Sequence, residues 1–177
     1  MSTVESRPAD ADGVVDTRDD GKRVLRFERR LAHSVDRVWA ALTSPDQLLG
    51  WWGSADELEL AEGGKIVMRW LNKDQDGNQV VLHGRVTRFE PPRLIEFDTD
   101  VHGVLRFELA DDHGATLLRF SSTVEIPDEV MPLVLAGWHM HLNFLAATLA
   151  GEPTDLVDLP MDEWQHWHDQ YEAQLAG

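Results

Sequence analysis

The histidines are the residues of this chain whose chemistry could support metal binding or proton transfer. The sequence contains eight of them and no cysteine, so imidazole is the first ligand to consider. His139 and His141 are two residues apart in a stretch with helical periodicity, which turns their side chains roughly 200° from each other. His166 and His168 have the same spacing. Because neither pair can hold one ion, we predict no metal site and no cofactor.

No sequence motif marks a catalytic nucleophile or a pair of acid–base groups. Ser121 and Ser122 lack the strained Gly-x-Ser-x-Gly turn that presents a reactive serine. Gly63 and Gly64 separate two strand-like segments, whereas a phosphate-binding loop leads from a strand into a helix. Glu96 lies between two large apolar residues, so it points away from any cavity that they face. We therefore predict no catalytic residue, and the sequence favours a protein that is not an enzyme.

The chain is strongly acidic. It has 32 Asp and Glu against 16 Lys and Arg, which gives a formal net charge of -16. Such a charge repels a phosphate backbone, and no cluster of Lys or Arg offsets it locally. We therefore expect no nucleic-acid partner. The acidic residues indicate a solvated surface more than a patch built for a basic partner.

Size and hydropathy indicate a single domain in the cytoplasm. The 177 residues, 42% of them hydrophobic, are enough for one domain with its own core. No apolar run approaches about 18 residues, and the first residues lack the charged and then apolar pattern of a secretory signal. We therefore expect no membrane span and a cytoplasmic location, in which a chain without disulfides is ordinary.

One long amphipathic helix near the end of the chain organises the predicted fold. We expect it to run for roughly 20 residues, or about 30 Å, with Asp128 as its N-cap and Pro132 in its first turn. Gly151 should end it. Its apolar stripe consists of Met131, Val134, Leu135, Trp138, Leu142, Leu145 and Leu149. His141 lies at the edge of this stripe, which must pack against another element.

Seven segments with strand-like alternation precede this helix. They are joined by short Gly-, Pro- and Asp-rich connections, so neighbouring strands should be antiparallel. Two short helices, capped by Ser34 and by Ser44 with Pro45, should follow the first strand. The seven predicted strands cover residues 22–31, 57–60, 65–71, 79–90, 93–100, 104–110 and 115–126.

Five segments, in this order, resemble one known family. They are LAHSVDRVWAALTSPDQLLGWWG, EGGKIVMRW, HGRVTRFEPPRLIEF, GATLLRFSS, and Gly137-Trp138 with the following leucines up to Gly151. Together they are similar to the bacterial homologues of the activator of heat-shock-protein ATPase, within the START-like and birch-pollen-allergen-like superfamily. The resemblance covers about residues 22–151. It implies an α+β helix-grip fold, in which a curved seven-stranded antiparallel sheet wraps around a long C-terminal helix.

We divide the chain into three parts. Residues 1–21 are expected to form a mobile acidic tail, with a short strand around Val14 and Val15. Residues 22–151 are the START-like helix-grip domain. Residues 152–177 are an extension with an amphipathic helix, whose apolar face carries Trp164, Trp167, Tyr171 and Leu175. This helix either packs back on the domain or completes a homodimer.

A curved sheet around a helix encloses space unless large side chains fill it, and such a space is the usual site for a small molecule. Sheet and helix periodicity predict the residues that would face this space: Trp39, Trp52, Met68, Trp70, Leu82, Val86, Phe97, Phe107, Phe120, Trp138, His141, Leu142 and Leu145. The alternative is that these side chains form a solid core. His141 would give a ligand one polar contact, or would be a core histidine satisfied by a neighbour.

Our leading functional prediction is the non-enzymatic binding or carriage of a small hydrophobic or aromatic molecule. The resemblance implies two alternatives. One is a co-chaperone or stress-related interaction protein that acts on a heat-shock ATPase. The other is a small polyketide-cyclase-like enzyme, because cyclases in this superfamily act largely through pocket shape. A cyclase should show a cluster of His, Asp, Glu or Tyr at the bottom of the pocket.

Overall fold

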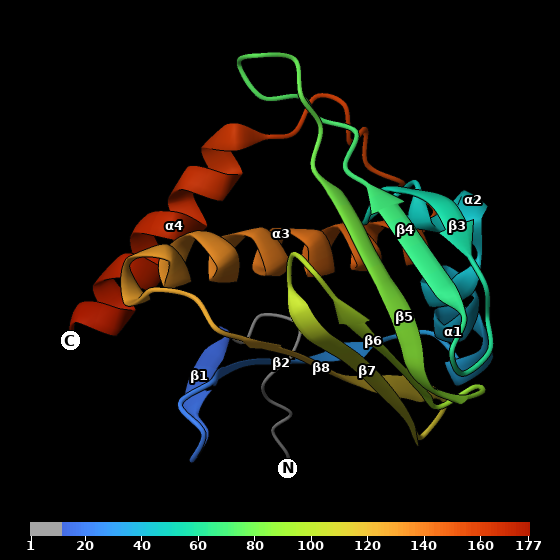
Figure 1. The fold of residues 1–177 in the computed structure, drawn as a ribbon. Coiled ribbons are helices and arrows are strands. Elements are labelled where there is room, and N and C mark those ends of the chain that lie inside the picture. The colour runs from blue at the N-terminus through green and yellow to red at the C-terminus, as the bar shows by residue number, and fades with distance from the viewer. Residues whose placement is uncertain (1–11) are drawn as a thin grey trace, which may run out of the picture.

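The computed structural model describes residues 12–177 and shows one curved antiparallel sheet with the helices on its concave side (Figure 1). The elements in chain order are β1 (Val14–Thr17), β2 (Arg23–Leu31), α1 (Val35–Thr43), α2 (Pro45–Leu48), β3 (Ser54–Leu58), β4 (Lys65–Arg69), β5 (Val81–Glu90), β6 (Leu94–Thr99), β7 (Gly103–Asp112), β8 (Ala115–Val124), the 3₁₀ helix η2 (Asp128–Val130), α3 (Met131–Leu149) and α4 (Met161–Ala176). The helix-grip fold expected from the sequence is therefore confirmed.

The sheet contains eight strands in the order β1-β2-β8-β7-β6-β5-β4-β3, all antiparallel to their neighbours. The prediction of seven strands was one too few, because β1 lies in the segment that we expected to be a mobile tail. A short strand around Val14 and Val15 was expected there, and it pairs with β2. Its side chains are mostly exposed, so its backbone hydrogen bonds rather than burial hold it. Residues 1–11 of the expected tail lie outside the described part.

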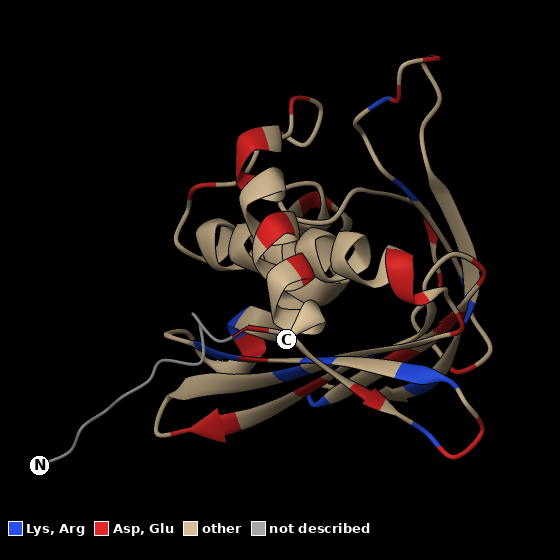
Figure 2. Ribbon diagram, turned by 90° about the vertical axis from the view of Figure 1, so that its left-hand side faces the viewer, with Lys and Arg blue, Asp and Glu red and all other residues tan. Residues whose placement is uncertain are grey.

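The strands alternate between an apolar inner face and a charged outer face, as predicted. Phe27, Phe107 and Phe120 lie opposite one another on β2, β7 and β8, and each is at most 2% exposed. On the outer face, Nη1 of Arg106 lies 3.0 Å from a carboxylate oxygen of Glu96. Glu96 thus points away from the interior. Figure 2 shows Lys and Arg along the strands, whereas α3 and α4 contain neither.

The two short helices close one end of the sheet. The Oγ atom of Ser34 accepts a hydrogen bond from the backbone N–H of Arg37, which confirms the predicted cap of α1. Proline begins α2, as expected. After α2, the indole N–H of Trp51 donates to the carbonyl of Ala41 at 2.8 Å, which ties this connection to α1.

Helix α3 crosses the concave face of the sheet (Figure 1). Asp128 does not cap it, because this residue begins η2 and its carboxylate pairs with Arg23. Gly151, with φ of 87°, follows the last turn in a conformation that favours glycine. By length and composition, Asp128–Leu149 could cross a membrane, but 61% of its most apolar window is buried inside the fold. This burial is that of the core helix of a soluble domain.

Helix α4 packs against α3, which is the intramolecular arrangement that the sequence left open. The ring of Trp167 stacks on His139, with centroids 3.7 Å apart, and Tyr171 is fully buried. Leu175 lies on the exposed end and is 40% accessible. The apolar stripe of α4 is therefore largely covered within one chain, so this helix needs no second subunit for its burial.

Candidate functional site

The best-formed candidate site is an apolar cavity beside the N-terminal half of α3. It has a volume of about 290 Å³ and is partly open to solvent. Four segments form its walls: α3, the start of α4, the β4–β5 connection and the β6–β7 turn. The lining residues are Trp70, Asn72, Val80, Val101, His102, Leu133, Val134, Gly137, Trp138, Met140, His141, Leu159, Met161 and Trp164. None of them is Asp, Glu, Lys or Arg, and His102 and His141 are the two ionisable residues among them.

Exposed apolar side chains form the rim of this cavity. Val80, Val101, Leu133 and Met161 come from four different segments, and each is between 40% and 55% exposed. Large apolar side chains scattered singly on a surface are ordinary, but these four meet at one opening. The opening therefore offers an apolar molecule a continuous path from solvent to the interior.

Gly137 makes room for the cavity. A glycine inside a helix costs roughly 0.5–1 kcal/mol relative to alanine, so a mid-helix glycine usually has a steric reason. A Cβ atom added to Gly137 would meet nothing within 4 Å, and therefore no neighbouring backbone requires a glycine at this position. Its effect is to leave part of the cavity wall without a side chain.

His141 lies inside the cavity wall with one ring nitrogen occupied. Its Nδ1 atom is 2.7 Å from the carbonyl oxygen of Trp51, and the residue is 6% exposed. Burial lowers the pKa of His141, and the bond to the Trp51 carbonyl opposes this only in part. The imidazole is therefore neutral near neutral pH, and Nδ1 must carry its proton because a carbonyl can only accept.

His102 presents a second imidazole from the β6–β7 turn. Its backbone is held on both sides, because its N–H donates to Thr99 Oγ1 and its carbonyl accepts from Ser122 Oγ. Its ring packs against Trp138, with centroids 5.3 Å apart. Burial, followed by the proximity of His141, lowers the pKa of His102 to about 4, so this ring is also neutral at neutral pH.

The predicted binding residues divide between the cavity and the solid interior. Trp70, Trp138 and His141 line the cavity. Trp39 is half-buried on α1, with its ring 5.9 Å from that of Phe89, and lies outside the cavity. The other nine are fully packed core side chains: Trp52, Met68, Leu82, Val86, Phe97, Phe107, Phe120, Leu142 and Leu145. For these, a role in ligand binding stays a prediction.

Sequence reasoning missed the cavity residues that come from connections and from α4. Asn72, Val80 and Val101 lie between strands, where period-two alternation does not predict which way a side chain points. Trp164 was placed on the apolar face of its helix, but not at a cavity. The one signal that could have found the site is Gly137, an unexplained glycine in the middle of the long helix.

A second buried polar group fastens α4 to the domain. The Tyr171 hydroxyl accepts from the backbone N–H of Gly13 at 2.6 Å and lies 2.7 Å from Nδ1 of His139. The contact with His139 is a second hydrogen bond of this hydroxyl, whose direction depends on the tautomer of the imidazole. Burial, with a smaller effect of the Arg29 cation, lowers the pKa of His139 to about 3, which keeps the imidazole neutral at neutral pH. All these partners are satisfied by one another, so we treat the group as structural.

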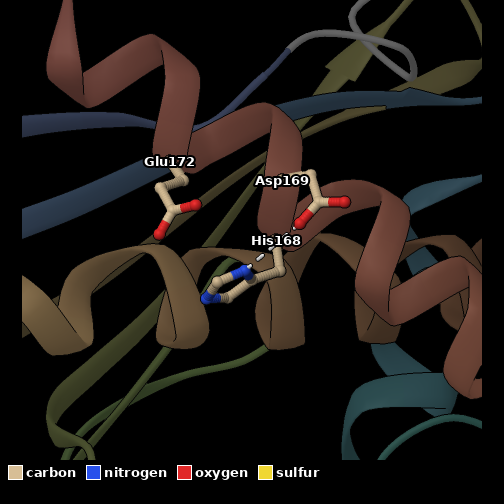
Figure 3. Close-up of side chains that lie close together, drawn as sticks. All are labelled: His168, Asp169 and Glu172. Carbon is tan, nitrogen blue, oxygen red and sulfur yellow. Dashed lines mark ion pairs between the residues drawn. The ribbon is translucent and has the colours of Figure 1, made fainter.

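A third cluster lies on α4, where His168, Asp169 and Glu172 bring their ligand atoms within 4.8 Å of one another (Figure 3). Both carboxylates are exposed, and Asp169 already accepts a hydrogen bond from Gln165 at 2.8 Å. The three side chains come from little more than one turn of a single helix. We assign no metal to them.

Comparisons with known proteins give the same fold and identify the family. CalU16 from Micromonospora echinospora is 23% identical with a TM-score of 0.69, over 94% of this chain and 98% of that one. A protein from Bordetella parapertussis is 24% identical with a TM-score of 0.67, over 95% and 94% of the two chains. For a Rhodobacter sphaeroides protein the identity is 25% and the TM-score 0.61, over 72% and 92%.

At such identities, the similarity to these solved structures shows the fold and does not show the function. The comparison with curated proteins gives no significant match. A family model, described as activator of Hsp90 ATPase homolog 1-like protein, matches residues 32–150, which is most of the helix-grip domain. The chain therefore belongs to the family of activator of Hsp90 ATPase homolog 1-like proteins.

Proposed function

We propose that this protein binds a small hydrophobic molecule in the cavity between α3, α4 and the two adjoining connections. The observation that carries the proposal is Gly137, which leaves open space in the middle of a helix that is otherwise closely packed. The protein gives up roughly 0.5–1 kcal/mol of helix stability at this residue. A binding function accounts for that loss, because an alanine or larger side chain would occupy part of the site.

The chemistry of the walls supports the same proposal. Tryptophans from three segments, Trp70, Trp138 and Trp164, supply most of the large apolar surface. The volume of about 290 Å³ lies at the lower end of the range for small-molecule sites. Binding of a compact, mostly apolar ligand is therefore favoured over binding of a long acyl chain.

The test compares two substitutions at one residue. Gly137→Leu should fill the cavity and weaken binding of N-phenyl-1-naphthylamine, an uncharged apolar dye, at least 10-fold in a fluorescence titration. Gly137→Ala is the matched control, because one methyl group leaves most of the volume and should change affinity less than 3-fold. Thermal unfolding should show that both variants fold. Equal affinity of the Gly137→Leu protein for the dye would exclude this cavity as the binding site.

A second candidate function is cyclase-like catalysis, which is favoured by the two histidines in the cavity. His102 and His141 are neutral at neutral pH, and a neutral imidazole can accept a proton from a bound substrate. The test is to incubate the protein with compounds that bind and to follow their conversion by mass spectrometry. Conversion that is lost in a His102→Gln variant would support catalysis, and unchanged compounds would support binding alone.

The co-chaperone alternative rests on the family description rather than on a feature of this structure. Its test is a measurement of ATP turnover by a bacterial Hsp90 with and without this protein. Stimulation that survives Gly137→Leu would point to a function independent of the cavity. The absence of both binding and stimulation would remove this alternative.

A further inference from the structure

We propose that the cavity selects uncharged ligands that carry a hydroxyl group, and that this hydroxyl donates a hydrogen bond to Nε2 of His141. The inference rests on the proposed binding function and specifies its ligand class. Three observations carry it: the protonation state that one hydrogen bond imposes on His141, the free nitrogen that results, and the absence of fixed charge from the cavity wall.

The first observation concerns which nitrogen holds the proton. Nδ1 of His141 lies 2.7 Å from the carbonyl oxygen of Trp51. Two hydrogen-bond acceptors would repel each other at that distance, so Nδ1 is the protonated nitrogen. The pKa of His141 is lowered by burial, and the ring therefore has only this one proton near neutral pH. Nε2 is left as a bare acceptor.

The second observation concerns what Nε2 meets. Among residues 12–177, Nε2 makes no hydrogen bond or ion pair, and it is not one of the polar atoms sealed off by surrounding protein. His141 is nevertheless 94% buried, since only 6% of its surface is exposed, and it forms part of the cavity wall. An acceptor that faces an apolar cavity without a partner favours a ligand that brings a donor.

A comparison with His139 shows that this arrangement is specific to the cavity. His139 is two residues away on the same helix, but its Nδ1 is hydrogen-bonded to the Tyr171 hydroxyl, at 2.7 Å, on the opposite side of α3. Its partner is therefore inside the protein. In His141, Nδ1 has a partner inside the protein, whereas Nε2 is available to accept a hydrogen bond from a ligand.

The third observation concerns charge. No Lys or Arg follows Arg119 in the sequence, so α3, α4 and their connections contain no cation that could pair with a ligand carboxylate. The cavity wall also has no Asp or Glu that could pair with an ammonium group. Burial of an unpaired charge is costly, whereas a hydroxyl needs only one or two hydrogen bonds. The wall thus favours an uncharged donor.

His102 can donate a second hydrogen bond to the ligand hydroxyl. A hydroxyl that donates to His141 still has lone pairs, and a neutral imidazole always offers one N–H. The ring nitrogens of His102 have no hydrogen-bond partner among the described residues, while its backbone is fixed by Thr99 and Ser122. The turn therefore holds a second imidazole at the cavity without using its ring nitrogens.

The experiment uses four naphthalene derivatives of nearly equal size with the full-length protein near neutral pH. They are 2-naphthol, 2-methoxynaphthalene, 2-naphthoate and 2-naphthylmethylammonium, and isothermal titration calorimetry gives their affinities. We expect 2-naphthol to bind about 3- to 10-fold more tightly than the methoxy compound, as one hydrogen bond allows. Both charged compounds should bind more weakly still. Stronger binding of either charged compound than of 2-naphthol would overturn the inference.

A variant pair assigns the preference to one atom. In His141→Phe, the affinities for 2-naphthol and 2-methoxynaphthalene should become equal within about 2-fold. His83→Phe is the control, because His83 is exposed on β5 and does not line the cavity, and it should keep the preference of the natural protein. If the preference persists in His141→Phe, another group makes the contact and the inference is wrong.

A measurement on the unaltered protein covers the case in which His141→Phe does not fold. With ¹⁵N-labelled histidine, the His141 Nε2 resonance should have the shift of an unprotonated nitrogen and should move upfield when 2-naphthol, but not 2-methoxynaphthalene, is added. An Nε2 that is already protonated in the free protein would overturn the inference. If none of the four compounds binds, the proposed function itself fails. If all four bind equally, only the hydroxyl preference fails.

Discussion

The surroundings of α3 are filled toward the inner face of the sheet and hollow toward two connections and the start of α4. On the sheet side, the Trp52 ring lies within 6.1 Å of those of Phe97, Phe107 and Trp138. Beside the N-terminal half, the same helix faces a cavity of about 290 Å³. Trp138 belongs to both regions, since its ring lies 4.6 Å from Phe120 and also lines the cavity.

The difference follows from what faces the helix. In the filled region, neighbouring strands present side chains at regular spacing on one surface, and large aromatic residues pack against one another there. In the hollow region, the facing walls are two connections and the first turn of α4. Such segments do not form a continuous layer, so a void can remain between them. The packing around α3, together with the missing side chain at Gly137, separates the filled core from the cavity.

The largest effect is expected from replacing a tryptophan in the filled region, and the same replacement beside the cavity provides the comparison. Trp52→Ala should lower the free energy of unfolding by about 3–5 kcal/mol, because it leaves a cavity in the filled region. Trp70→Ala should cost less, because that side chain is only half-buried and already borders the void. Urea unfolding of both variants measures the difference. Equal losses would mean that the two regions are packed alike.

Lower pH should destabilise both regions through their neutral histidines. His102 beside the cavity and His139 beneath α4 have pKa values lowered to about 4 and about 3 in the folded protein. Each binds a proton near pH 6.5 when unfolded, so the unfolded state takes up more protons as the pH falls. Stability should be flat above pH ~6.5 and should fall below it by up to about 1.4 kcal/mol per pH unit for each histidine.

Urea midpoints measured between pH ~7.5 and ~5 test this dependence of stability on pH. The pKa values of the Asp56 and Glu90 carboxyl groups are lowered, so these groups titrate below that range. His102→Gln and His139→Gln should each make the slope shallower. A slope unaffected by His139→Gln would show that the seam between α3 and α4 admits water, and that this region is not filled.

Tyr171→Phe tests how firmly α4 is held at its packed end. It removes the hydroxyl between Gly13 and His139 and leaves two buried polar groups without partners, which should cost about 1–3 kcal/mol. Hydrogen exchange should show the loss mainly in α4. The control is Glu172→Ala, an exposed neighbour on the same helix, with an expected change within about 0.5 kcal/mol. Similar changes in the two variants would contradict a structural role for Tyr171.

The smallest expected effect belongs to the hollow region. Gly137→Ala should raise the free energy of unfolding by about 0.5–1 kcal/mol, since the added methyl group meets nothing within 4 Å and the unfolded chain loses freedom. Thermal unfolding measures the gain. A loss of stability would show that the space beside Gly137 is not open.

Local sequence features sufficed to predict the architecture. Alternation placed Phe97, Phe107 and Phe120 on the inner face, Ser34 marked the start of α1, and Gly151 marked the end of α3. These signals depend on the chemistry of neighbouring residues, which is why they can be read without a structure. The pairing of β1 with β2 was not predicted, because the side chains of this short strand do not specify its partner.

Only the tertiary structure decided which of the predicted binding residues border a cavity. Periodicity gives the direction of Trp52 and Trp138 alike, but it cannot show that neighbours fill the space around the first and leave space beside the second. That depends on residues far apart in the chain, from Asn72 to Trp164, whose positions follow from how connections and helices pack. The sequence determined which side chains point inward, and three-dimensional packing determined where the interior stays open.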